Sequence, residues 1–293
     1  MINEMTNENY FVSISNFKDL QINIKCLNPS NYLLERLNSV ESSLLFSATL
    51  TPKNYYENLI CENKNDDFLN VPTCFDKNRL KILVSNNIST KYNDRIKTVD
   101  RIIKYVNSFV LQKKGNYILY CPSFEYLQLI KNCIFNEKIN VFYQDLNMNI
   151  FEKNNFFEPF QSNQLFNLAV CVIGGSFSES INFTNNSLNG VIVVGVGMPS
   201  ICFENNLIKE FYNKKNLDGF KYAYIDPGIN KILQAVGRII RNEKDSGVAL
   251  LIDDRYFNNS YSYLFKEKFS NYIKINNEEQ LIYNINYFYK SLD

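Results

Sequence analysis

The sequence predicts an α/β fold in which a parallel β-sheet is covered by helices on both faces. Short apolar runs recur along the chain, and residues 191–196, Val-Ile-Val-Val-Gly-Val, are the clearest of them. Segments with helical spacing alternate with these runs. The runs are almost continuously apolar, which is typical of strands that are buried on both faces of a parallel sheet.

The N-terminal part is predicted to hold short elements. Residues 11–14 and 21–24 have the composition of short strands, and residues 43–47 are predicted to form a buried strand. A proline at the first helical position follows a threonine cap at Thr51, so we expect residues 53–60 to be helical.

From residue 80 onward, strands and helices are predicted to alternate. Residues 94–113 are predicted to form a long helix, and Ser123 is expected to cap a second helix that ends near residue 135. Two helices are expected within residues 261–291. The apolar stripe of the long helix is Ile96, Val99, Ile103, Val106 and Val110. The strands are predicted at residues 80–84, 117–120, 140–143, 168–173, 191–196 and 247–252.

The composition excludes several classes of protein. The 293 residues include no histidine, which excludes Ser-His-Asp and Cys-His hydrolases and histidine-ligated zinc. The net charge of +1 gives no global basic field, so nucleic-acid binding must depend on a local patch. No apolar run reaches the length of about 18 residues that a spanning helix needs. Residues 1–10 are polar and lack a signal-peptide core, so we expect a cytoplasmic protein with no membrane partner.

The cysteines are predicted to be reduced core residues. Their number is odd and none lies in a C-x-x-C pair, so neither a metal site nor a disulfide framework is indicated. They are Cys26, Cys61, Cys74, Cys121, Cys133, Cys171 and Cys202.

Two arginines form the most informative motif of the chain. Arg238 and Arg241 are three residues apart, so on a helix both guanidinium groups lie on one face, and Gln234 lies one turn earlier. Arginines that point the same way suit a triphosphate because the planar fork donates two hydrogen bonds to phosphate oxygens. The alternative is a solvated helix face that carries two cations.

A pair of glycines follows a predicted buried strand. Gly174 and Gly175 come directly after residues 168–173, at the end of the strand where open α/β sheets bind ligands. Without side chains, they let backbone N–H groups approach a phosphate. The alternative is a turn that requires glycine for its backbone alone.

The order of five segments resembles the second half of a superfamily 2 helicase of the xeroderma-pigmentosum-group-D/DinG type. Residues 45–52 resemble motif III, residues 120–127 motif IV and residues 174–183 motif V. Residues 234–241 resemble motif VI, and residues 253–256 resemble the segment that closes it. The resemblance implies a RecA-like parallel sheet flanked by helices. It also implies that residues 1–75 are a remnant of a first motor lobe and that residues 76–293 are the second lobe.

The resemblance implies roles for individual residues. Arg238 and Arg241 would be arginine fingers that reach the γ-phosphate, and Gln234 would contact a phosphate or a water. The motif V loop would couple ATP to the nucleic-acid strand and would contain Gly174, Gly175, Ser178, Glu179 and Asn182. The motif III segment would link the ATP state to the lobe interface and would contain Ser47 and Thr49. The family usually has glycine and aspartate where this chain has Ser180 and Asn182, so the strength of coupling is open.

The motif IV resemblance implies contacts to the nucleic acid. Ser123, at a helix N-terminus, can donate a hydrogen bond to a phosphate of the strand. Phe124 can stack on a base. We expect single-stranded DNA as the partner, with RNA possible, and the family implies 5′ to 3′ translocation and a role in DNA repair. Asp253, Asp254 and Arg255 are predicted to form an ion-paired cap after a strand.

The sequence contains no G-x-x-x-x-G-K-[ST] loop. We therefore expect ATP and Mg²⁺ to be shared with a P-loop-bearing first lobe, and the chain alone to be inactive in ATP hydrolysis. No iron–sulfur cluster is expected, because the family's cysteines for it lie in the first lobe. A truncated product, a split helicase and a repurposed lobe remain open. The alternative function is a non-catalytic module that binds nucleic acid or docks a partner.

Overall fold

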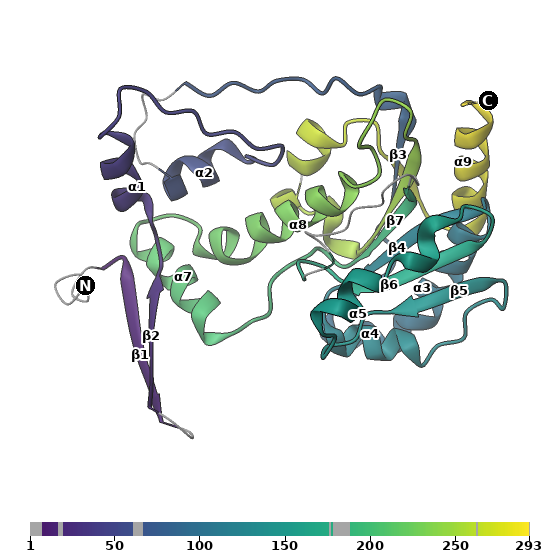
Figure 1. Ribbon diagram of the computed structural model, residues 1–293, viewed down its shortest axis with the longest axis horizontal. Helices are drawn as coiled ribbons and strands as arrows, with labels where there is room; N and C mark the ends of the chain where they lie inside the picture. Colours follow the sequence, from purple (N-terminus) through teal and green to yellow (C-terminus); the bar gives the residue numbers. More distant parts are fainter. Residues whose placement is uncertain are drawn as a thin grey trace. The chain divides into compact units, whose positions relative to one another are not determined.

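The computed structural model describes residues 8–16, 20–60, 67–175, 177, 188–261 and 263–292. The described residues form two compact units (Figure 1). The smaller unit combines Met1–Val71 with Ser200–Asp226, and the larger combines Pro72–Pro199 with Pro227–Asp293. No pattern in the sequence predicts that Ser200–Asp226 groups with the N-terminal residues.

The larger unit is built on a seven-stranded sheet in the order β5-β6-β4-β7-β8-β3-β9, and all of its strand pairs are parallel. This confirms the predicted α/β class with a parallel sheet. The short strand β9 was not predicted. The strands are β3 (Leu80–Ser85), β4 (Gly115–Cys121), β5 (Ile139–Tyr143), β6 (Phe166–Val172), β7 (Leu188–Val194), β8 (Gly247–Ile252) and β9 (Ile273–Ile275).

Helices flank this sheet. Only one of the two helices expected within residues 261–291 is an α-helix, because the first part of that range forms a π-helical turn and then β9. The α-helices are α3 (Arg95–Val110), α4 (Phe124–Lys131), α5 (Ile150–Asn155), α8 (Asp226–Val236) and α9 (Glu278–Lys290). Shorter helical turns are Lys77–Arg79, Tyr92–Asp94, Glu158–Gln161, Lys221–Ile225, Asp254–Phe257, Asn259–Tyr261 and Leu264–Lys268.

Both faces of the sheet are buried. One face packs with α3, α4 and α9 in a single apolar cluster that includes Leu119 and Leu250. The predicted stripe of α3 lies in this cluster except for Ile96, which is 80% exposed. The alternate strand residues, such as Tyr120 and Leu251, are fully buried on the opposite face.

The smaller unit contains the predicted hairpin but not the predicted strand at residues 43–47. The hairpin strands β1 (Tyr10–Asn16) and β2 (Leu20–Cys26) pair antiparallel as expected. Residues 43–47 have no regular structure and are exposed, so that prediction is wrong. A strand needs a neighbour to pair its backbone groups, and no described residue pairs with this segment.

The smaller unit also contains two helices near the N-terminus and α7, and Tyr55 of the second helix packs against Tyr222 with ring centroids 5.5 Å apart. They are α1 (Ser30–Leu37) and α2 (Lys53–Ile60), and α7 is Phe203–Lys214. The rings of Tyr212 and Tyr222 stack with centroids 4.2 Å apart. The side chain of Asn58 in α2 donates a hydrogen bond to the Tyr222 hydroxyl. The contacts of Tyr222 with α2 explain why Ser200–Asp226 groups with the N-terminal residues.

The described cysteines are free thiols, and only some of them lie in the core. Cys121 and Cys171 are buried in β4 and β6 as predicted, and burial raises the pKa of the Cys121 thiol. Cys26 and Cys74 are exposed, so the prediction of core positions is wrong for these two. Cys61 lies outside the described residues. Across the described segments, no helix is both long enough and apolar enough to span a membrane.

Candidate functional site

The carboxyl edge of the parallel sheet carries several of the predicted site residues. Ser123 and Phe124 follow β4, and Gly174 and Gly175 follow β6. Since all strand pairs are parallel, the loops that follow these strands lie at the same edge. This edge is the usual ligand-binding position of an open α/β sheet.

The two arginines follow the end of α8 and do not lie along its face. The helix ends at Val236, and the backbone N–H of Arg238 donates to the Ala235 carbonyl at 3.4 Å in a tighter turn. The expectation that both arginines lie one turn apart on a helix face is therefore wrong. Gly237 directly follows the helix, and its low helix propensity fits an end at this point. Gln234 lies in the last turn of α8 and is exposed.

The charges of Arg238 and Arg241 nevertheless act on each other. Burial, and then the positive charge of Arg238, lower the pKa of the Arg241 guanidinium. Both arginines also act on Tyr120 in β4, where they oppose the rise in pKa that burial causes. Two like charges held near each other in a partly buried setting favour binding of an anion.

Gly174 has a backbone and surroundings that other residues do not fit. Its φ of 73° lies in the left-handed region, and an added Cβ would lie 2.6 Å from Cε of Lys231 in α8. Burial lowers the pKa of the Lys231 ammonium. Gly175 donates to the Val172 carbonyl at 3.4 Å, which closes a turn. This geometry requires glycine at position 174 for its backbone, and that requirement is the same for a structural turn and for a coupling loop.

The remaining residues of the predicted coupling segments are not brought together. Ser178, Glu179 and Asn182 lie outside the described residues. Ser47 and Thr49 lie in the smaller unit, where the Thr49 N–H donates to Ser47 Oγ at 3.2 Å. Both are exposed or partly exposed in irregular backbone.

Ser123 caps α4 as predicted. Its Oγ accepts a hydrogen bond from the backbone N–H of Tyr126 at 3.2 Å. The Ser123 hydroxyl proton can still be donated to a ligand. Phe124 is half-buried in the first turn of α4.

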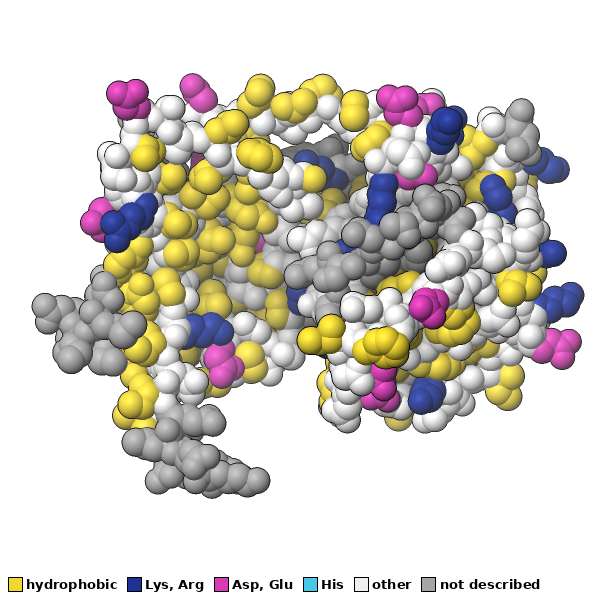
Figure 2. Space-filling view, viewed as in Figure 1, with side chains coloured by type: hydrophobic (Ala, Val, Ile, Leu, Met, Phe, Trp, Pro, Cys, Tyr) yellow, Lys and Arg dark blue, Asp and Glu magenta, His cyan; other side chains and the backbone are white. Residues whose placement is uncertain are grey.

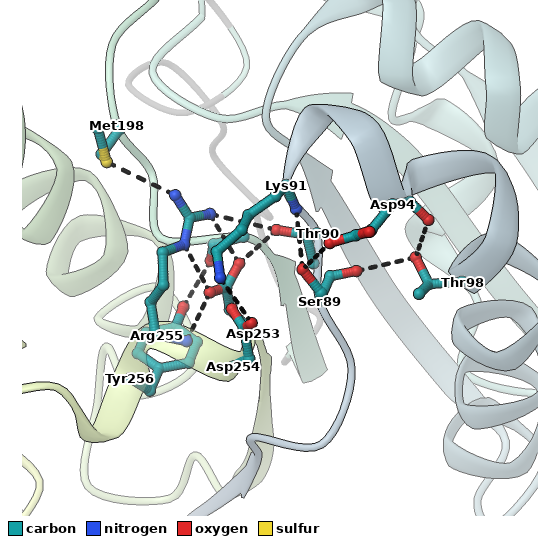
Figure 3. Close-up of polar contacts among 11 residues, drawn as sticks. Ser89, Thr90, Lys91, Asp94, Thr98, Met198, Asp253, Asp254, Arg255 and Tyr256 are labelled. Carbon is teal, nitrogen blue, oxygen red and sulfur yellow. Dashed lines mark hydrogen bonds and ion pairs between the residues drawn. The ribbon is translucent and has the colours of Figure 1, made fainter.

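A polar network links the loops after β3, β7 and β8 (Figure 3). The Asp253 carboxylate is fully buried and accepts hydrogen bonds from Arg255 Nε and Nη2, each at 2.8 Å. The Thr90 hydroxyl also donates to Asp253. Arg255 Nη1 lies 3.8 Å from Met198 Sδ. The predicted ion-paired cap after the strand is therefore confirmed.

Sequence reasoning missed the other half of this network. Thr90 and Lys91 lie in the loop before α3, and Lys91 Nζ is 2.9 Å from Asp254 Oδ2. No motif marks this loop, and only the register of β3 beside β8 brings it to Asp253.

The side chains of Arg238 and Arg241 offer hydrogen-bond donors to a ligand. No group of three or more Cys, Asp or Glu side chains that could hold a metal was found among the described residues. The arginine pair instead supplies donors that match phosphate oxygens.

Comparisons with known proteins place the chain in a family. A family model described as "Helicase C-terminal domain" matches residues 106–272. The "3'-5' exonuclease DinG" of Staphylococcus saprophyticus is 23% identical over 271 residues, which cover 89% of this chain and 29% of the relative. The "ATP-dependent DNA helicase CHL1" of Debaryomyces hansenii is 22% identical over 286 residues, which cover 87% of this chain and 34% of the relative.

The solved structures give the same fold. A structure described as an XPD helicase has a TM-score of 0.66 at 20% identity and is matched over 94% of this chain and 49% of its own. A structure described as XPD in the apo state has a TM-score of 0.65 at 20% identity, over 94% of this chain and 56% of its own. The chain thus spans about a third of the length of these two curated relatives, 29% of one and 34% of the other.

Proposed function

This chain belongs to the helicase C-terminal domain family, and from that premise we propose that it is the second motor lobe of an ATP-dependent DNA helicase. In this proposal Arg238 and Arg241 contact the phosphates of ATP, and Gln234 contacts a phosphate or the attacking water. Bound ATP with Mg²⁺ would supply the phosphoryl group and the metal that neutralises it. The arginines of this chain would stabilise the charge that develops on that group.

The observation that carries the proposal is the arginine pair after α8. The two guanidinium groups are close enough for Arg238 to lower the pKa of Arg241. An anion with several negative charges relieves such repulsion. Two oxygens of a triphosphate can also accept hydrogen bonds from the planar guanidinium group of one arginine.

A P-loop-bearing first lobe is the partner that this function requires. The smaller unit offers apolar surface that suits such a partner, and Figure 2 shows hydrophobic side chains gathered on one of its faces. Leu44 and Phe46 are 83% and 86% exposed, in the segment that has the composition of a buried strand. Apolar side chains of a folded unit that are this exposed favour a protein interface.

The nucleic-acid side of the proposal rests on the carboxyl edge of the sheet. Ser123 would donate to a phosphate of single-stranded DNA, Phe124 would stack on a base, and Gly174 and Gly175 would belong to the coupling loop. Translocation from 5′ to 3′ and a role in DNA repair are what the resemblance implies for the whole helicase.

The test is strand-stimulated ATP hydrolysis by this chain mixed with a P-loop-bearing first lobe. We expect activity only in the mixture, and Arg238→Ala or Arg241→Ala should lower it by about 10³-fold or more. Arg101→Ala, on the exposed side of α3, is the matched control and should have no effect. If the mixture hydrolyses ATP equally well without both arginines, the proposal of arginine fingers is wrong. If the mixture hydrolyses no ATP, and if ATP does not change the affinity of this chain for the strand, the non-catalytic module is supported instead.

A further inference from the structure

Arg95, which lies outside all of the helicase motifs, is held between two tyrosine rings. It is the first residue of α3. Its guanidinium carbon lies 5.1 Å from the ring centroid of Tyr92 and 5.3 Å from that of Tyr126. Cation–π contacts with both rings restrain the side chain, so its donors point in defined directions.

One donor of this guanidinium has no hydrogen-bond partner among the described residues. Among them, Arg95 Nε is buried without a hydrogen-bond partner, and so is the Tyr126 hydroxyl beside it. The nearest carboxylate oxygen, Glu125 Oε2, lies 4.0 Å from Arg95 Nη1, and the Glu125 side chain is 82% exposed. Such an exposed, long ion pair is weak. Buried donors in proteins are almost always paired, so these two groups make the site unusual. The Arg95 side chain as a whole is 21% exposed, so part of it is open to a ligand that accepts hydrogen bonds.

The surroundings favour an anion as that ligand. Arg95 opens the 16-residue helix α3, and Tyr126 lies in the first turn of α4, so two helix N-termini meet here. The positive ends of their dipoles add to the arginine charge. Ser123 caps α4 within the same turn and has a hydroxyl proton to donate.

The loop that carries Tyr92 and leads into Arg95 is held in place (Figure 3). Ser89 Oγ donates to Asp94 Oδ2 at 2.7 Å, and Thr98 Oγ1 donates to the Ser89 carbonyl at 2.8 Å. Thr90 is bonded to the buried Asp253. A site that is ordered before binding loses little entropy when its ligand arrives.

We propose that Arg95 binds a phosphodiester group of single-stranded nucleic acid, and that the exposed ring of Tyr92 stacks on the adjacent base. The Tyr92 side chain is 75% exposed, so its outer face is accessible to a base. The choice of a nucleic-acid strand as the source of the phosphate rests on the proposed function. The site would extend the strand contact beyond Ser123 to a residue that no motif identifies.

The test is the binding of a fluorescein-labelled oligothymidylate to the full chain, measured by fluorescence anisotropy over a salt series. Arg95→Gln should weaken binding about tenfold and reduce the salt slope by about 0.7, the value for one phosphate contact on a single strand. Arg95→Lys keeps the charge but loses the planar fork, so it should restore part of the affinity. Glu125→Gln removes a competing carboxylate and should strengthen binding.

Lys104→Gln is the matched control because it removes one positive charge from the exposed side of the same helix. It should change the affinity much less than Arg95→Gln does. Thermal unfolding of each variant by circular dichroism checks that the fold is intact, and Arg95→Lys remains informative if Arg95→Gln unfolds.

The outcomes separate this inference from the proposed function. Strand binding that is equal in wild type, Arg95→Gln and Arg95→Lys would overturn the Arg95 site and leave the helicase proposal standing. Displacement of the strand from Arg95 by free ATP at its ordinary binding concentration would identify the ligand as a nucleotide and also overturn it. Absence of strand binding by the wild type, in a mixture that still hydrolyses ATP, would overturn the Arg95 site together with the strand contacts proposed for Ser123 and Phe124, and would leave the arginine fingers standing.

Discussion

The carboxylate of Asp245 accepts hydrogen bonds from the backbone N–H of Arg241 at 2.9 Å and of Asn242 at 3.0 Å. Asp245 is 8% exposed, and its negative charge partly offsets the effects that lower the pKa of Arg241. The loop is closed further by Arg79, whose Nη1 donates to the Lys244 carbonyl at 3.1 Å. Asp245 therefore holds the backbone from which the Arg241 side chain projects.

Asp245→Ala should lower kcat for ATP hydrolysis in the lobe mixture by up to about 100-fold, because the Arg241 loop loses its anchor. Asp245→Asn keeps an acceptor oxygen in the same place and should retain more activity. If both variants keep wild-type kcat and KM while Arg241→Ala is impaired, Asp245 has no positioning role.

Loss of Arg255 should destabilise the larger unit. Arg255→Ala leaves the fully buried Asp253 carboxylate with fewer partners, so the free energy of unfolding should fall by about 3 kcal/mol. Urea unfolding measures this change. Lys91→Ala breaks the exposed ion pair with Asp254 and should lower the free energy of unfolding much less than Arg255→Ala does. Equal costs for the two variants would contradict the structural role of Arg255.

Gly174→Ala tests whether this glycine is structural or functional. A side chain in the left-handed region should cost about 1–2 kcal/mol, and Cβ would also displace the Lys231 side chain. In the double variant with Lys231→Ala the contact is removed, so part of the stability should return. Urea unfolding of the single and double variants measures the cost of the backbone conformation and the cost of the contact with the Lys231 side chain. A stable Gly174→Ala variant that loses only strand-stimulated hydrolysis would favour the coupling role.

Buried tyrosines should make the protein sensitive to alkali. Burial raises the pKa of Tyr261 from 10.0 to about 12, with Arg255 opposing the rise and Asp253 adding to it. The folded state then holds this phenol proton more tightly than the unfolded state does. The stabilisation from this proton is fully present below pH 10 and is lost as the pH rises from 10 to about 12.

The alkaline loss can be followed by urea unfolding at a series of pH values. Tyr261→Phe has no phenol proton at this position, so its stability should fall less steeply over the same range. Tyr283→Phe, at a position that is 67% exposed in α9, is the matched control and should behave like the wild type. Identical slopes for all three proteins would contradict the assignment to Tyr261.

The sequence by itself determined the class of fold and the family. Strands that are buried on both faces of a parallel sheet read as nearly continuous apolar runs, such as residues 191–196. The pattern therefore predicts a parallel sheet even when its strand order is unknown. The order of the motifs gave a resemblance that the family match over residues 106–272 confirms. Local caps such as Ser123 were also predicted correctly, because a cap depends only on its own turn.

The tertiary structure decided which residues meet. The end of α8 at Val236 places Arg238 and Arg241 in a loop, and the anchor of that loop is the buried Asp245. Arg95 lies between Tyr92 and Tyr126 because α3 and α4 pack on the same face of the sheet. Residues 43–47 show the converse, since an apolar run forms a strand only beside another strand. Periodicity describes one segment at a time, whereas strand pairing and contacts between distant side chains depend on the whole fold.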